Sequence, residues 1–159
     1  MDIKYSQDDN GAYQTAKTYI EATSPTVFKY LSTTEGIQQW FPQLEVDERA
    51  VGGHIYFHLE GDNYETMHIT EFAEDQRISY TWDVGEVKFQ LEADNNSTIL
   101  TLEEYLPYTF PHIILDFAGW QFQLDNVKHV IEQGEPIDQQ NLDFENKKFE
   151  IAQHLNIEQ

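Results

Sequence analysis

Alternation of apolar and polar residues over residues 44–106 is the feature that most constrains the fold of this chain. In "GGHIYFHLEG", Ile55, Phe57 and Leu59 alternate with His54, Tyr56 and His58, and the same period recurs in "ETMHITEF", "RISYTWDV", "EVKFQLEA" and "STILTLEEYL". A two-residue period places the apolar side chains on one face of a strand. The connections "EGDN", "AEDQ", "DVGE" and "ADNNS" are short and rich in turn-forming residues. The sequence therefore predicts an antiparallel meander with one buried face.

One long helix is predicted after the meander, over residues 112–134. On a helical wheel, the apolar residues that follow Ile113 on one face all fall within about 40° of it: Phe117, Trp120, Leu124, Val127 and Ile131. This stripe should face the sheet. Gly119 lies off the stripe, and a glycine inside a helix costs roughly 1 kcal/mol relative to alanine. We therefore expect Gly119 to allow another backbone or a large side chain to approach the helix closely.

A strand and two short helices are predicted before the meander. Residues 1–11 are polar and end in the turn signal "DDNG", and "AYQTAKTYIEA" is typical of an edge strand. Pro25 suits the first turn of a helix in "SPTVFKYL", and Thr33 or Thr34 can cap a second helix that Pro42 ends. This order of elements predicts an α+β fold, in which a curved antiparallel sheet of six to seven strands wraps around the long C-terminal helix.

The charge balance bears on the partners of the protein. The chain has 9 basic and 29 acidic residues, for a net charge of −20. Such a surface repels phosphate backbones and anionic headgroups, so we expect no nucleic-acid partner. The charge serves solubility or attracts a basic protein partner. No signal peptide and no apolar run of about 18 residues is present, which predicts a cytoplasmic protein without stable membrane insertion.

Five segments carry a resemblance to a known family. In order along the chain they are "SPTVFKYLSTTEGIQQWFP", "VGGHIYFHLEG", "ITEFAEDQRISYTW", "STILTLEEY" and "GWQFQLDNV". The chain resembles the activator-of-Hsp90-ATPase homologue 1-like group of the START-like (SRPBCC) superfamily over roughly residues 12–134. The resemblance implies a helix-grip, Bet v 1-like fold with a mostly apolar cavity between sheet and long helix. Members of the superfamily bind lipids, sterols, polyketides or flavonoid-like aromatics, some are cyclases, and others regulate a chaperone ATPase.

The resemblance divides the chain into a polar N-terminal segment (residues 1–11), a helix-grip domain (residues 12–134) and a C-terminal extension (residues 135–159). In the extension, Phe149, Ala152 and Leu155 could form one more helical face. That face could dock beside Gly119, form a dimer contact or act as a lid. Alternatively, the extension is a loosely ordered polar tail.

The candidate ligand-binding residues are large apolar side chains that the predicted strands and helices turn inward. They either line a cavity for a small apolar or aromatic ligand or pack against one another as core. In such a cavity the phenol of Tyr80 could orient the ligand. The candidates are Trp40, Phe41, Phe57, Leu59, Met67, Ile69, Tyr80, Trp82, Phe89, Leu91, Phe117, Trp120 and Leu124.

Glu71 is the one acid that we nominate for catalysis. It shares strand parity with Met67 and Ile69, and a carboxylate facing an apolar cavity would have a raised pKa and could transfer a proton. Alternatively, a bulge turns Glu71 outward, or it pairs with Arg77. No motif for nucleophilic catalysis or phosphate binding is present.

The absence of cysteine excludes disulfides and thiolate chemistry. The six histidines are scattered. His54 and His58 lie about 13 Å apart along one strand, and His58 could approach His68 across a hairpin. We therefore expect neither a metal nor a cofactor.

Three functions remain open. We favour a non-catalytic protein, monomeric or homodimeric, that holds a small hydrophobic or aromatic ligand. The first alternative is a protein-interaction module that regulates a chaperone or a stress response. The second is a cyclase- or hydratase-like enzyme that uses Glu71 and Tyr80.

Overall fold

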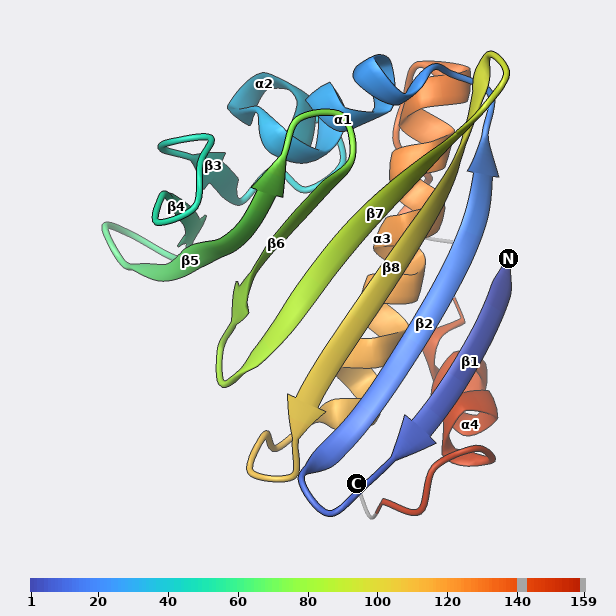
Figure 1. Ribbon diagram of the computed structural model, residues 1–159. Coiled ribbons are helices and arrows are strands. Elements are labelled where there is room, and N and C mark those ends of the chain that lie inside the picture. The colour runs from blue at the N-terminus through green and yellow to red at the C-terminus, as the bar shows by residue number, and fades with distance from the viewer. Residues whose placement is uncertain (140–142, 158–159) are drawn as a thin grey trace.

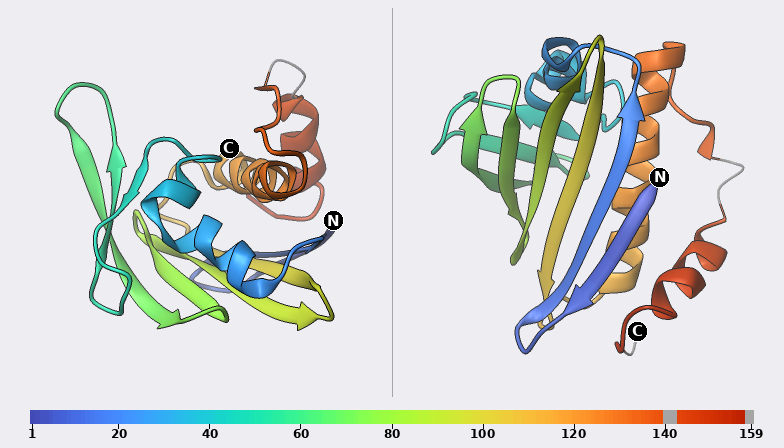
Figure 2. Two further views of the ribbon diagram at one scale, coloured as in Figure 1. Left: turned by 90° about the horizontal axis from the view of Figure 1, so that it is seen from above. Right: turned by 45° about the vertical axis from the view of Figure 1, so that its right-hand side comes forward.

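The protein forms one antiparallel sheet that curves around a long helix. The structure, a computed structural model, describes residues 1–139 and 143–157. The elements are β1 (Asp2–Gln7), β2 (Gly11–Ile20), α1 (Ser24–Ser32), α2 (Thr34–Ile37), β3 (Leu44–Val46), β4 (His54–His58), β5 (Tyr64–Ala73), β6 (Arg77–Trp82), β7 (Gly85–Asp94), β8 (Ser97–Pro107), α3 (Ile113–Gln133) and α4 (Phe144–Ala152). The strand order is β1-β2-β8-β7-β6-β5-β4-β3, and α3 lies along the concave face (Figures 1 and 2). The predicted α+β helix-grip architecture is confirmed.

The sheet has eight strands, so the prediction of six to seven was wrong. The polar N-terminal segment supplies one of the extra strands: β1 pairs antiparallel with β2, from Asp2 opposite Lys17 to Gln7 opposite Ala12. Its residues alternate between exposed and half-buried. A strand at the edge of a sheet buries little apolar surface, so its alternation is weak in the sequence. Strand β3 has three residues, too few for a periodic signal.

Helices α1 and α2 close one end of the sheet, at the top of Figure 1. The Thr33 side chain accepts a hydrogen bond from Gly36 N at 3.0 Å, which confirms the predicted cap of α2. Trp40 follows α2, and its Nε1 donates to Tyr30 O at 2.7 Å. This bond satisfies the indole N–H in the core and holds the ring over the sheet.

The predicted stripe on α3 is buried from Ile113 to Val127, and Ile131 packs against the core as a partly buried residue. Helix α3 ends at Gly134, whose φ of 85° lies in the left-handed region that glycine tolerates best. Among the described residues, no helix is long and apolar enough to cross a membrane.

The expectation of a close approach at Gly119 was wrong, because a Cβ placed there would meet nothing within 4 Å. Replacing Gly119 by alanine should therefore remove a helix-propensity cost without a clash. We expect Gly119→Ala to raise the free energy of unfolding by about 0.5–1 kcal/mol. Urea denaturation measures this change, and a loss of stability would mean that the flank is closely packed after all.

The C-terminal extension docks on the flank of α3. Phe144 of α4 packs edge-on against Phe122, with ring centres 6.1 Å apart. Ile151 and Leu155 are buried, whereas Phe149 is 65% exposed. The prediction that Phe149, Ala152 and Leu155 form one helical face was therefore wrong, although Leu155 itself is buried. The residues of the extension that pack against the core are instead Phe144, Ile151 and Leu155.

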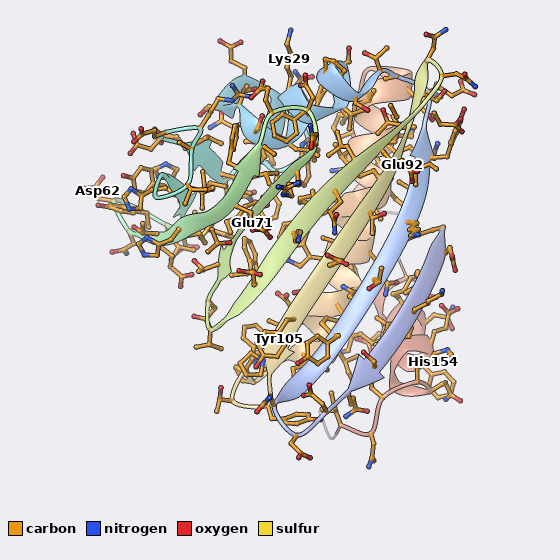
Figure 3. The ribbon with its side chains drawn as sticks, viewed as in Figure 1. Lys29, Asp62, Glu71, Glu92, Tyr105 and His154 are labelled. Carbon is orange, nitrogen blue, oxygen red and sulfur yellow. The ribbon has the colours of Figure 1, made fainter. Side chains whose placement is uncertain are left out.

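The end of the extension reaches β1. His154 stacks on Tyr5 with ring centres 5.1 Å apart, and Asn156 N donates to Gln7 Oε1 at 2.6 Å. Figure 3 marks His154 beside β1. These contacts hold the extension against the edge of the sheet as well as against α3.

Candidate functional site

Six of the predicted aromatic side chains form one continuous cluster between the sheet and α3: Trp40, Phe41, Phe57, Trp82, Phe89 and Trp120. Trp120 is its centre, with ring distances of 4.9 Å to Trp82, 5.8 Å to Phe41, 6.0 Å to Phe89 and 6.5 Å to Trp40. The rings meet mostly edge to face, the geometry that aromatic quadrupoles favour. They therefore pack against one another and occupy the space beneath this part of α3.

The remaining candidates divide into buried and exposed residues. Met67, Ile69, Tyr80, Phe117 and Leu124 are buried in the same core. Leu59 is 46% exposed, because β4 ends at His58 and Leu59 lies beyond it. Leu91 is half-buried and borders a depression shared with Asp2 and Lys17, away from the aromatic cluster. Leu59 and Leu91 are therefore not brought to the site.

A cleft of about 310 Å³ opens at the end of the aromatic cluster. It is lined by Phe57, Glu65, Met67, Trp82, Asp83, Phe110, Pro111 and His112. Three of these residues were predicted ligand contacts, and Phe110 to His112 come from the segment that leads into α3. The cleft combines apolar walls with two carboxylates.

A polar row that the sequence analysis missed crosses the inner face of the sheet. Tyr5, Gln14, Glu104, Val87 and Tyr80 are successive partners on β1, β2, β8, β7 and β6. Gln14, Glu104 and Tyr80 are each at most 2% exposed. The row thus places four polar side chains under α3, interrupted only by the valine.

Helix α3 completes this polar row with Gln121 and Asp116. Gln14 Nε2 donates to Glu104 Oε1 at 2.8 Å and to Phe117 O at 3.2 Å. Gln121 Nε2 donates to Gln14 Oε1 at 2.9 Å and to the Tyr5 hydroxyl at 2.7 Å. The two amides therefore link β1, β2 and β8 to α3 and fix the carboxyl group of Glu104.

The buried Glu104 and the half-buried Asp116 form a carboxyl pair. Burial raises the pKa of Glu104 well above its usual range, the hydrogen-bonded Asp116 raises it further, and the bond from Gln14 opposes them. Glu104 Oε2 and Asp116 Oδ2 receive no hydrogen bond from any other described group. The raised pKa of Glu104 favours a proton between these two oxygens, which would satisfy both of them.

Trp82 connects this carboxyl pair to the cleft. Its side chain lines the cleft, and its Nε1 donates to Asp116 Oδ1 at 3.3 Å.

The hydroxyl of Tyr80 is buried and has no hydrogen-bonding partner among the described residues. Burial raises the pKa of Tyr80, and the nearby Glu104 raises it further, so the phenol keeps its proton.

The sequence did contain a signal for Glu104. It shares strand parity with Leu100, Leu102 and Leu106, all of which are buried. An acid in an otherwise apolar strand face is a candidate buried carboxyl group. No local pattern indicates that Gln14, 90 positions earlier in the chain, would be its partner.

The nomination of Glu71 as an inward-facing acid was wrong. The register shifts between Ile69 and Glu71, and this bulge turns the side chain outward. Glu71 contacts Lys88 Nζ at 2.9 Å and Arg77 Nε at 3.7 Å, and the bond from Lys88 is the main cause of its lowered pKa. Figure 3 marks Glu71 on β5, with α3 behind the sheet. The alternative interpretation, in which a bulge turns Glu71 outward and Glu71 pairs with Arg77, is confirmed.

The histidines pair differently from the expected contact. His68 lies opposite His54, with ring centres 5.1 Å apart, while His58 Nε2 lies 2.7 Å from Glu45 Oε1. Register explains this pairing, since β4 and β5 align His58 with Tyr64. Within residues 1–139 and 143–157, no three potential metal ligands cluster.

Comparison with known proteins identifies the family. Residues 21–132 match the model of the family "Activator of Hsp90 ATPase homolog 1-like protein". A conserved protein of unknown function, EF2215 from Enterococcus faecalis, is 31% identical, with a TM-score of 0.86 and coverage of 97% of this chain and 92% of that one. No curated protein matches the sequence.

Two more distant structures share the fold. CalU16 from Micromonospora echinospora is 17% identical, with a TM-score of 0.75 and coverage of 98% and 97%. The Aha1 dimer from Colwellia psychrerythraea is 20% identical, with a TM-score of 0.64 and coverage of 76% and 96%. The match of the family model over most of the chain, together with the helix-grip architecture, shows that this chain belongs to the family of activator of Hsp90 ATPase homologue 1-like proteins.

Proposed function

We propose that the protein binds a small hydrophobic or aromatic molecule in the cleft beside the aromatic cluster. The observation that carries the proposal is the cleft of about 310 Å³, whose walls include Phe57, Met67, Trp82 and Phe110. Its volume is at the lower end of the range for small-molecule sites. The packed rings beneath α3 leave the cleft as the accessible part of the predicted site. The ligand is therefore small, of the size of one or two fused rings.

The segment from Phe110 to His112 gives the cleft one wall that belongs to neither the sheet nor a helix. It connects β8 to α3, and Phe110 is only partly buried where it packs against the core. Binding can be completed by a shift of this segment without repacking the sheet. The protein-interaction hypothesis stays a prediction. The enzyme hypothesis also stays a prediction, but without Glu71 as its acid.

Titration with 2-naphthalenemethanol, followed by calorimetry and tryptophan fluorescence, tests the proposal. We expect saturable binding with a change in the emission of Trp82. Phe110→Ala should weaken binding by about five- to tenfold, because it removes apolar contact area worth about 1–1.5 kcal/mol. Leu59→Ala is the matched control, since Leu59 is 46% exposed and lies outside the cleft. Equal affinity of the wild type and Phe110→Ala, or no binding at all, would refute the cleft as the site.

A further inference from the structure

We propose that His54 and His68 together bind a divalent transition-metal ion on the outer face of β4 and β5. Both side chains alternate with buried residues, Ile55 and Met67, and therefore point away from the core (Figure 1). The two imidazoles hold the ion and water completes its coordination, so the site needs no third protein ligand. This site is separate from the cleft and does not rest on the proposed function.

The register of the β4–β5 hairpin brings the two imidazoles together. Ile69 N donates to Gly53 O at 2.9 Å, which marks a hydrogen-bonded pair of residues beside His54 and His68. In an antiparallel ladder, such pairs alternate with pairs that exchange no backbone hydrogen bond. His54 lies directly opposite His68, so these residues form a non-hydrogen-bonded pair, in which Cα atoms are about 4.5 Å apart and side chains are closest.

The spacing of the two rings suits one tetrahedral ion. The ring centres of His54 and His68 are 5.1 Å apart, and the ring planes are inclined by 69°. Zinc binds imidazole nitrogen at about 2.0–2.1 Å, so two imidazoles on one tetrahedral zinc have ring centres about 5 Å apart. Rotation of these two accessible side chains can therefore direct one nitrogen of each ring to a common ion, without a change in the backbone.

Asp47, directly after β3, favours His54 as a metal ligand. Its Oδ2 lies 3.8 Å from Nδ1 of His54. A carboxylate beside one ring nitrogen favours the proton on that nitrogen and leaves the other nitrogen, Nε2, free to bind a metal. The negative charge of Asp47 also attracts the ion, and the net charge of −20 adds a long-range attraction for cations.

His68 is available as the second ligand. Among the described residues, its imidazole forms no hydrogen bond or ion pair and contacts only the ring of His54. The third histidine of this hairpin differs, because Nε2 of His58 lies 2.7 Å from Glu45 Oε1 and the residue opposite it is Tyr64. The hairpin therefore offers one pair of imidazoles, and it is formed across the strands rather than along β4.

Titration of the whole chain with zinc chloride at neutral pH tests the inference, with calorimetry for the affinity and nuclear magnetic resonance of the imidazole nitrogens for the ligands. We expect the side-chain nitrogen signals of His54 and His68 to shift together and those of the other four histidines to stay unchanged. His54→Gln and His68→Gln should each weaken zinc binding at least about tenfold, because a single imidazole cannot chelate the ion.

His58→Gln is the matched control. His58 is on the same face of β4, about 13 Å from His54 along the strand, and has no imidazole opposite it. This variant should bind zinc within about twofold of the wild-type affinity, as expected for a substitution at a distant site. The backbone amide spectra of the three variants would verify that each retains the fold.

Three results would overturn the inference. The first is the absence of a shift in the nitrogen signals of His54 and His68 at a large excess of zinc. The second is wild-type zinc affinity in His54→Gln or His68→Gln, since carboxylates would then hold the ion. The third is a loss of affinity in His58→Gln as large as in the other two variants, which would place the ion beside Glu45. None of these results bears on ligand binding in the cleft.

Discussion

Trp120→Ala is expected to lower the free energy of unfolding by about 3–5 kcal/mol, the usual cost of removing a large aromatic side chain from a core. Trp120 is 2% exposed, and its ring contacts four other aromatic rings. No single neighbour can fill the space that its indole leaves, because those rings come from three parts of the chain: the segment after α2, β6 and β7. Urea denaturation followed by far-ultraviolet circular dichroism measures the loss.

Leu115→Ala is the control for this substitution. Leu115 is on the same helix and is 47% exposed, so its truncation should change stability by less than about 0.5 kcal/mol. A loss below about 1 kcal/mol for Trp120→Ala would show that the neighbouring rings collapse into the vacated volume. The cluster would then be pliable, and a ligand larger than the cleft could be accommodated.

Raising the pH from 5 towards 8 is expected to destabilise the wild type through Glu104. In the unfolded chain this side chain loses its proton above about pH 4.3, whereas the native state keeps it because burial and Asp116 raise its pKa. The native state therefore binds more protons than the unfolded state. In this window the free energy of unfolding falls by up to about 1.4 kcal/mol for each pH unit, until the pH exceeds the pKa in the native state.

Glu104→Gln should remove this component, since glutamine does not titrate. The groups that face Glu104 are Gln14 from β2, Tyr80 from β6 and Asp116 from α3. Other acids also contribute to the pH profile, and Glu71, whose pKa is lowered, contributes with the opposite sign, so the comparison must be between variants. Glu103→Gln is the matched control, because the adjacent residue lies on the opposite, more exposed face of β8. Parallel pH profiles of the free energy of unfolding for Glu104→Gln and the wild type would mean that the pKa of Glu104 is the same in the native and the unfolded state.

Periodicity was sufficient to predict the helix-grip core. The stripe from Ile113 to Val127 on α3 and the alternation in β4 to β8 both depend on burial over many residues, so single exceptions do not obscure them. Strand β1 escaped prediction because its inward side chains are only partly buried. Glu71 was misplaced because one inserted residue reverses strand parity, and a bulge leaves no mark in the hydrophobic pattern.

The site was harder to predict than the fold. Parity correctly identified which aromatic residues face α3, but whether rings fill a space or line it depends on their rotamers and on the position of the helix. The carboxyl pair required knowledge of register, since β2 places Gln14 opposite Glu104 across 90 positions of sequence. The position of Asp116 beside Glu104 follows from how α3 crosses the sheet, which no local pattern encodes.

The docking of the C-terminal extension on β1 has a consequence for the order in which the chain assembles. The contact between Gln7 and Asn156 spans 149 positions, whereas the hairpins from β4 to β8 join residues that are close in sequence. Closing so long a loop costs more chain entropy than closing a hairpin, unless intervening structure has already brought the ends together. We therefore expect the meander and α3 to form first and the extension to join last, sealing one end of the buried polar row after the core has consolidated.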